Sequence, residues 1–165
     1  MFASVKKVLV GSLIVAGSGL VFAQPDGQMI ARVDKRVLTL AGARVVAAAA
    51  ETEAKRLNTT GPVAVVDDGG NLLYLLRIDN TFPAGSYVAM DKARTAATFR
   101  MPTRNLEDAV KNGRTSLVAV TQMTPLAGGV PIVIDGQIVG AVGVGGAANA
   151  QQDEELAKIA AAAIR

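Results

Sequence analysis

The sequence predicts one mixed α/β domain of the α+β kind, in which an antiparallel sheet of two β-hairpins and one short strand is flanked by helices. Two pairs of Val-, Leu- and Ile-rich runs are each joined by an Asp-Gly turn, which is typical of hairpins. Segments with apolar residues at steps of three and four lie before, between and after these pairs. The chain has 165 residues, 50% of them hydrophobic, which suits one packed core and is too short for two domains.

The first 23 residues, 1–23, resemble a secretory signal peptide. Lys6 and Lys7 precede an apolar stretch, and residues 21–23 (Val-Phe-Ala) form a small-x-small cleavage pattern. The apolar stretch is interrupted by glycine and is shorter than the roughly 20 residues that a membrane-spanning helix needs. We therefore expect cleavage, a periplasmic or secreted protein, and no membrane association afterwards.

The composition of the remaining chain excludes several classes of protein. Loss of the two leader lysines lowers the formal net charge from +3 to +1. A nearly neutral domain with 4% aromatic residues lacks the basic surface of a nucleic-acid-binding protein. The chain has no cysteine, so disulfides cannot stabilise it in an oxidising compartment. Its stability must come from packing, to which oligomerisation can add.

The predicted elements follow from local signals. Residues 24–37 are polar and mixed and should form an N-terminal arm before the domain at 38–165. Thr39 can cap a helix that ends near Asn58. The remaining predictions are hairpin strands at 62–67 and 71–78, helices at 86–99 and 105–111, a short strand at 117–120, hairpin strands at 130–134 and 137–144, and a last helix begun by a capping box of Asn149 and Gln152.

The glycine cluster at residues 143–148 can be aligned with the dinucleotide-binding pattern G-x-G-x-x-G/A between a strand and a helix. The pattern also requires a second parallel strand after the helix and an acidic residue about 20 positions on, and neither is found. We therefore expect no nucleotide site of this type. The amides at the start of the last helix could instead receive an anionic group such as a carboxylate.

Four segments of the sequence resemble, in this order, the GlcG/HbpS family of haem-degrading or haem-binding HbpS-like domains: PVAVVDDGGNLLYLLRID, DKARTAATFRMPT, PLAGGVPIVIDGQIVGAVGVGGA and QDEELAKIA. The resemblance runs from about Leu38 to the C-terminus. It implies a layered, profilin-like fold and a homo-oligomer, for which an octamer is one expectation. It also implies haem or a related tetrapyrrole as the ligand, with haem degradation in some exported members. Other members accompany glycolate metabolism or are fused to cobalamin enzymes.

Lys92 is the main candidate that the resemblance places in the middle helix. It could bind a propionate or another carboxylate, or serve as a base, with Asp153 as a further catalytic candidate. The alternative is a buried structural ion pair with Asp153 or Asp67. Both interpretations remain open from the sequence.

The other ligand-binding candidates are Arg77, Tyr87, Thr95, Arg100 and the pair Gly128-Gly129. Thr95 shares a helical face with Lys92, three positions away. The two glycines either allow a ligand to approach the backbone or form a turn that needs positive φ.

Haem binding must be achieved without histidine or cysteine, since the chain has neither. The candidate iron ligands are therefore Tyr87, Met90 and Met101. Tyr87 is favoured over Tyr74, because it lies near a helix start after a loop whereas Tyr74 lies within a strand. The methionines are more typical of core packing than of iron ligation.

Three functions remain open. The first is an exported haem- or tetrapyrrole-binding protein, with degradation as a secondary activity. The second is an enzyme acting on a small carboxylic or hydroxy acid, with Lys92 and Arg100 binding the anion and Asp153 as acid or base. The third is a non-catalytic oligomeric module that stabilises another exported protein. The missing histidine argues against metal-dependent hydrolysis and excludes a Ser-His-Asp triad.

Overall fold

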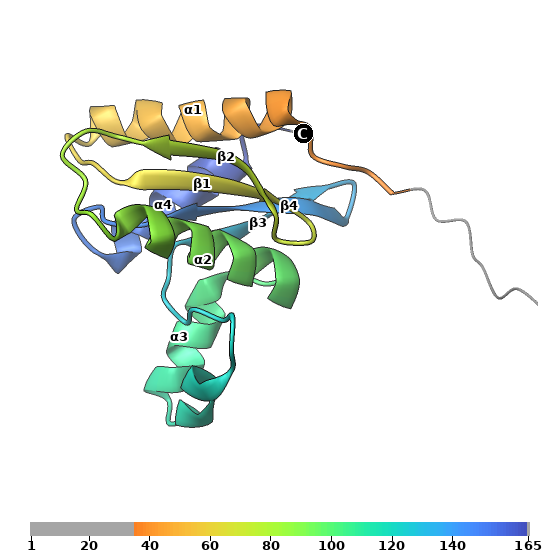
Figure 1. Ribbon diagram of the computed structural model, residues 1–165, viewed down its shortest axis with the longest axis vertical. Helices are drawn as coiled ribbons and strands as arrows, with labels where there is room; N and C mark the ends of the chain where they lie inside the picture. The colour runs from red at the N-terminus through yellow and green to blue at the C-terminus, as the bar shows by residue number, and fades with distance from the viewer. Residues whose placement is uncertain (1–34, 165) are drawn as a thin grey trace, which may run out of the picture. The chain divides into compact units, whose positions relative to one another are not determined.

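The computed structural model describes residues 35–164. The predicted signal peptide and most of the predicted arm lie outside these residues. The described part contains two β-hairpins, and their strands form one antiparallel sheet in the order β2-β1-β4-β3 (Figure 1). The strands are β1 (Pro62–Asp67), β2 (Leu72–Arg77), β3 (Gly129–Ile134) and β4 (Gln137–Val144). Both predicted hairpins are confirmed.

Four α-helices surround the sheet. They are α1 (Leu40–Arg56), α2 (Gly85–Phe99), α3 (Thr103–Lys111) and α4 (Ala150–Ala161). α1 and α4 pack on one face of the sheet and α2 packs on the other, so the fold has three layers (Figure 1). The predicted caps are present: Thr39 Oγ1 accepts the N–H of Gly42, and Asn149 Oδ1 accepts the N–H of Gln152.

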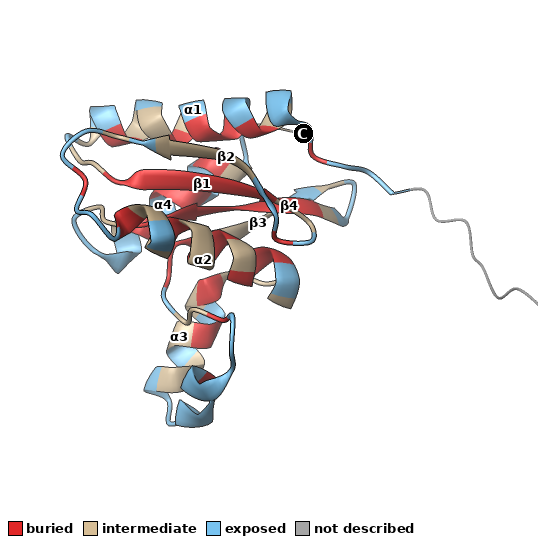
Figure 2. Ribbon diagram, in the orientation of Figure 1, coloured by how far each residue is buried: buried red, intermediate tan, exposed pale blue. Residues whose placement is uncertain are grey.

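The core lies on both faces of the central strands, which are buried along most of their length (Figure 2). The helices meet the sheet through small side chains, and α2 contributes Ala89, Ala93 and Ala96 to the buried cluster on its side. Gly143 of β4 makes this approach close, because a Cβ there would lie 2.1 Å from the carbonyl oxygen of Ala89. α1 also packs inward through small side chains, since most of its buried residues are alanines.

The predicted short strand at 117–120 is wrong. Its residues belong to a 3₁₀ helix, η1 (Thr115–Ala119), and to the turn that follows. Leu117 is the buried residue of η1 and packs with Leu106 and Met123 in a small separate cluster. η1 lies beside α3, and both are below α2 in the view of Figure 1. An apolar run without a neighbouring strand cannot form a ladder, so the chain satisfies its backbone with local turns instead.

Among the helices of residues 35–164, none combines the length and the apolar character that crossing a bilayer requires.

Candidate functional site

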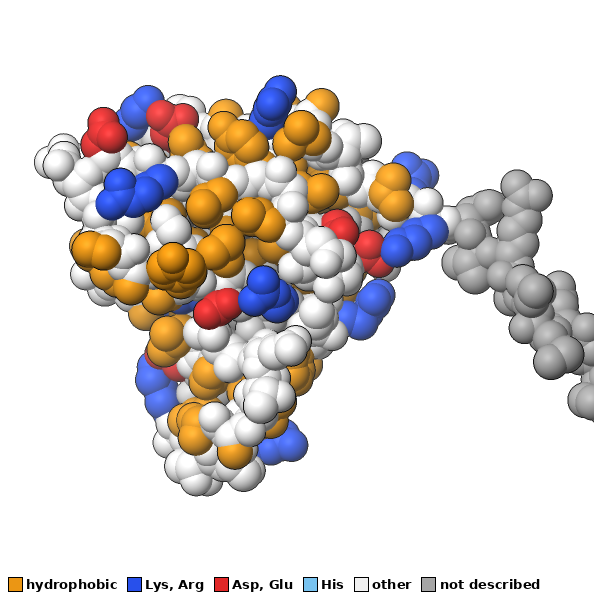
Figure 3. Space-filling view, viewed as in Figure 1, with side chains coloured by type: hydrophobic (Ala, Val, Ile, Leu, Met, Phe, Trp, Pro, Cys, Tyr) orange, Lys and Arg blue, Asp and Glu red, His pale blue; other side chains and the backbone are white. Residues whose placement is uncertain are grey.

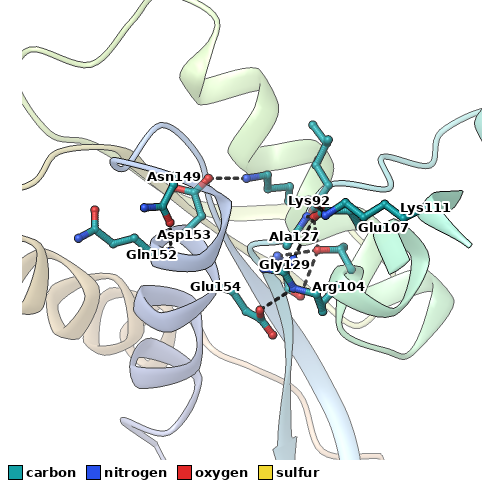
Figure 4. Close-up of polar contacts among 12 residues, drawn as sticks. Lys92, Arg104, Glu107, Lys111, Ala127, Gly129, Asn149, Gln152, Asp153 and Glu154 are labelled. Carbon is teal, nitrogen blue, oxygen red and sulfur yellow. Dashed lines mark hydrogen bonds and ion pairs between the residues drawn. The ribbon is translucent and has the colours of Figure 1, made fainter. Parts of the chain in front are cut away.

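Lys92 of α2 and Asp153 of α4 form a buried ion pair. Lys92 Nζ lies 2.6 Å from Asp153 Oδ2, and the two side chains are 4% and 7% exposed. Lys92 Nζ also donates to the carbonyl oxygen of Val144 at 3.0 Å. Figure 4 shows the two side chains pointing toward each other from their helices. The lysine therefore joins α2 to the end of β4 and to the start of α4, and Asp153 rather than Asp67 is its partner.

The glycine cluster after β4 holds the carboxylate of Asp153. The N–H of Ala147 donates to Asp153 Oδ1 at 2.8 Å, and the N–H of Gly146 donates to Oδ2 at 3.4 Å. The N–H of Ala148 donates to Gln152 Oε1, which closes the first turn of α4. The anionic group expected at these amides is thus a side chain of the protein itself.

Gly128 and Gly129 pack against Lys92. Gly128 has φ +120°, and a Cβ there would lie 2.9 Å from Lys92 Nζ. A Cβ on Gly129 would lie 2.3 Å from the carbonyl oxygen of Lys92. These glycines are therefore required because the backbone before β3 lies close to Lys92 of α2, and not because a ligand lies there. At Gly128 the positive φ also agrees with the turn interpretation.

Thr95 is fully buried one turn after Lys92. Its hydroxyl donates to the carbonyl oxygen of Asp91 at 2.7 Å and accepts the N–H of Thr124 at 2.9 Å. These contacts attach the segment after η1 to α2. Thr95 thus lies on the same buried side of α2 as Lys92, with its hydroxyl engaged by the backbone.

A cavity of about 340 Å³ opens above the ion pair. Its wall is largely apolar, with Phe82, Val88, Leu126 and Ala147 around the ion pair, and Glu107 is a third charged residue that lines it. A volume of this order suits a small organic molecule. Lys92 and Asp153 therefore form the polar floor of a mainly apolar cavity.

A charged cleft of about 580 Å³ adjoins this cavity between α3 and α4. Arg104 Nε donates to Glu154 Oε2 at 2.8 Å, and Lys158 lies 2.7 Å from Glu154 Oε1. Glu107 pairs with Lys111 and accepts the N–H of Ala127 at 2.6 Å. These links attach α3 to α4 and to the segment before β3 (Figure 4).

The two glutamates in this cleft are held in their charged form. For each of them burial raises the pKa, but hydrogen bonds outweigh burial and bring the pKa below the ordinary value of 4.5. The donors are Lys111 and the N–H of Ala127 for Glu107, and Lys158 and Arg104 for Glu154. Sequence analysis missed this cluster. The spacing of Glu154 and Lys158 by four residues could have predicted their ion pair on one face of the helix. The link between Arg104 and Glu154 joins residues 50 positions apart, so no local spacing indicates it.

Arg77, Tyr87 and Met90 lie on a different surface. Tyr87 is 67% exposed in the first turn of α2, and Met90 packs half-buried against the cluster that includes Leu75 of β2. Arg77 at the end of β2 donates to the carbonyl oxygen of Thr81, just before α2. Apolar side chains gather on this surface over β2 and α2 (Figure 3).

Arg100 and Met101 lie at the opposite end of α2. Arg100 is exposed in the left-handed conformation that ends the helix, and it does not line the cavity above Lys92. Met101 packs against the small cluster of α3 and η1. The predicted site residues thus form an inner group around Lys92, an outer group around Tyr87, and two residues apart from both. Within residues 35–164, no group of three or more acidic side chains is arranged to hold a metal ion.

Comparison with known proteins assigns the family. A family model described as "Haem degrading protein HbpS-like" matches residues 38–162. Protein GlcG of Escherichia coli is 47% identical over 110 residues, which cover 67% of this chain and 82% of GlcG. The crystal structure of a double mutant of HbpS from Streptomyces reticuli aligns with a TM-score of 0.76 and 32% identity, over 94% of this chain and 99% of that one.

A further solved structure is that of a complex of PduOC with haem. It aligns with a TM-score of 0.71 and 26% identity, over 79% of this chain and 96% of that one. Both structures share the layered α/β fold described above. The chain therefore belongs to the HbpS-like family, the family that four segments of its sequence resemble.

Proposed function

We propose that this chain binds haem or a related tetrapyrrole on the surface formed by β2 and the first half of α2. We call this surface the β2–α2 face and define it by Leu72, Leu75, Arg77, Tyr87 and Met90. The observation that carries the proposal is the exposed phenol of Tyr87 on an apolar surface with a guanidinium at the same end. Membership of the HbpS-like family and the similarity to PduOC, which was solved with haem, support it.

The side chains of the face suit the chemistry of haem. Tyrosine oxygen is an established axial ligand of haem iron, and Tyr87 is 67% exposed. Met90 follows three positions later on the helix, so it lies on the same side as Tyr87. Leu72 and Leu75 offer apolar surface to a macrocycle. Arg77 can bind a propionate, because its guanidinium matches the geometry of a carboxylate.

A haemin titration followed by absorbance in the Soret region tests the proposal. The Tyr87→Phe variant should lose at least about tenfold in affinity, the change that corresponds to ~1.4 kcal/mol. Tyr74→Phe is the matched control, since it removes the other tyrosine hydroxyl from β2, and it should bind as the unmodified chain does. Equal affinity for all three proteins would exclude Tyr87 as the ligand. No saturable shift with the unmodified, folded chain would reject haem binding altogether.

We also propose that the protein is exported and that haem degradation is a secondary activity. Export is supported by the signal-peptide pattern at 1–23, and it predicts a mature N-terminus at Gln24 in the periplasm or medium. N-terminal sequencing of the fractionated protein tests this. Degradation predicts that the Soret band decays with release of iron after binding is complete, and a stable band over hours would limit the function to binding.

A second candidate function is the binding or turnover of a small carboxylic or hydroxy acid above Lys92 and Asp153. It is favoured by the cavity of about 340 Å³ that has this ion pair as its polar floor. Arg104 and not Arg100 would supply the nearby guanidinium, because Arg104 lines the adjoining cleft. A screen of small hydroxy acids for thermal stabilisation tests this function. A hydroxy acid bound in this cavity should leave the affinity for haemin unaffected, because Tyr87 lies on another surface.

A further inference from the structure

Lys92 is the one buried lysine of residues 35–164. Its side chain is 4% exposed, whereas the other lysines of this range are between 57% and 69% exposed: Lys35, Lys55, Lys111 and Lys158. Apolar residues of similar volume often stabilise a core as well as a buried ion pair does, so stability alone does not explain the pair. Lysines withdrawn from water are typical of sites that form Schiff bases, because burial favours the neutral amine that reacts.

The amine of Lys92 has its proton acceptor in place. Lys92 Nζ lies 2.6 Å from Asp153 Oδ2 and donates to the carbonyl oxygen of Val144 at 3.0 Å (Figure 4). These contacts use two of the three N–H groups of an ammonium. A proton can pass to Asp153 and back along the existing hydrogen bond, with no movement of either helix. An adjacent base of this kind activates an amine as a nucleophile.

The cavity above the ion pair brings a ligand to this nitrogen. Among the described residues that line its volume of about 340 Å³, Lys92 carries the one amine, and the chain has no cysteine to compete as a nucleophile. Phe82, Val88 and Leu126 make most of the wall apolar. A site that excludes water protects a reactive intermediate from hydrolysis. A carbonyl compound that enters the cavity therefore meets one amine in a wall that favours the condensed product.

We propose that Lys92 forms a Schiff base with a small aldehyde or 2-oxo acid in this cavity. Asp153 first accepts a proton from the ammonium group of Lys92. The freed amine attacks the carbonyl carbon and forms the C–N bond, while the carbonyl oxygen takes up the proton from Asp153 to give a carbinolamine. Asp153 then moves a second proton from the nitrogen to the hydroxyl, which leaves as water as the C=N bond forms.

The step is balanced within the site. One water leaves for each Schiff base formed, and no oxidant or reductant is consumed. The nitrogen of the protonated Schiff base keeps its positive charge, so Asp153 remains paired at 7% exposure. The N–H groups of Gly146 and Ala147 hold Asp153 throughout. The proposal rests on the second candidate function, because it uses the same cavity and gives the ligand a carbonyl group.

Reduction with sodium borohydride tests the proposal in the unmodified full chain. Borohydride converts a Schiff base into a stable secondary amine, which peptide mass mapping locates. The probes are pyruvate, glyoxylate and propanal. With at least one of them Lys92 should be labelled at least about tenfold faster than Lys158, because the bound carbonyl is held beside the amine. A lysine that is only structural should be labelled last, since it is the least exposed, and that order with all three probes would overturn the proposal.

Two variants and one further compound complete the test. Lys92→Arg keeps a positive charge opposite Asp153 but cannot form a Schiff base, and it should lose the label at this position. Lys55→Arg is the matched control at an exposed ion pair, and it should keep the label at Lys92. If Lys92→Arg does not fold, the label map of the unmodified chain decides.

Lactate separates this proposal from the second candidate function, because it has a hydroxyl group where pyruvate has the carbonyl. Thermal stabilisation by lactate or pyruvate without a label at Lys92 would overturn the Schiff base and leave binding of a small acid in place. Neither stabilisation nor a label would reject both.

Discussion

Replacement of Lys92 by methionine tests how much the fold depends on the buried ion pair. Lys92→Met keeps most of the side-chain volume but leaves the carboxylate of Asp153 without its cation at 7% exposure. Loss of one partner of a buried pair costs ~3–5 kcal/mol of unfolding free energy. The N–H groups of Gly146 and Ala147 still donate to Asp153, so we expect the lower end, about 3 kcal/mol.

Urea denaturation followed by circular dichroism measures this loss. With a slope of about 2 kcal/mol per molar urea, the midpoint should fall by roughly 1.5 M. Lys55→Met is the matched control. It removes the same type of side chain from the pair with Glu51, where the lysine is 69% exposed, and it should cost at most about 1 kcal/mol.

A small effect of Lys92→Met would refute the reasoning. If the two variants lose the same free energy, within about 0.5 kcal/mol, the pair does not hold α2 and α4 together, and the interpretation of Lys92 as a structural residue fails. A large loss of stability would not exclude a ligand in the cavity. It would require that the second candidate function be tested by ligand binding to the unmodified chain.

Three further predictions concern the surroundings of the site. Gly129→Ala should destabilise the fold by ~1–3 kcal/mol in chemical denaturation, because its Cβ would lie 2.3 Å from the backbone of Lys92. Gly69→Ala is the control and should cost much less, because the nearest contact of its Cβ would be a side-chain atom at 3.1 Å. Asn149→Ala should cost ~0.5–2 kcal/mol through loss of the cap of α4, and Asn149→Asp should retain most of it in the same assay. The pKa of Glu154 is lower in the folded chain than in the unfolded chain, so its contribution is present above pH 4.5 and is lost as the pH falls below that value. The slope of the unfolding free energy against pH between roughly pH 5 and 3 should therefore be smaller in Glu154→Gln, and an unchanged slope would contradict this.

Local signals in the sequence predicted most of the fold. Asp-Gly turns between apolar runs identified both hairpins, and Thr39 and Asn149 marked the starts of two helices correctly. Hairpin turns and helix caps depend on residues a few positions apart, so the pattern within one segment is sufficient to predict them. The strand predicted at 117–120 failed for the opposite reason, because a strand needs a neighbouring edge and η1 lies beside α3 instead.

The sequence by itself thus determined most of the secondary structure, the family and the residue types available to a site. Only the tertiary structure decided which of them meet. Lys92 could have paired with Asp67 or Asp153, and the choice of Asp153, 61 positions away, follows from the packing of α2 and α4 at the end of β4. The same packing separates Lys92 from Tyr87, which lies five positions earlier on the same helix, because opposite sides of α2 face the core and the solvent. Contacts between distant segments depend on how whole elements pack, and no local pattern encodes that arrangement.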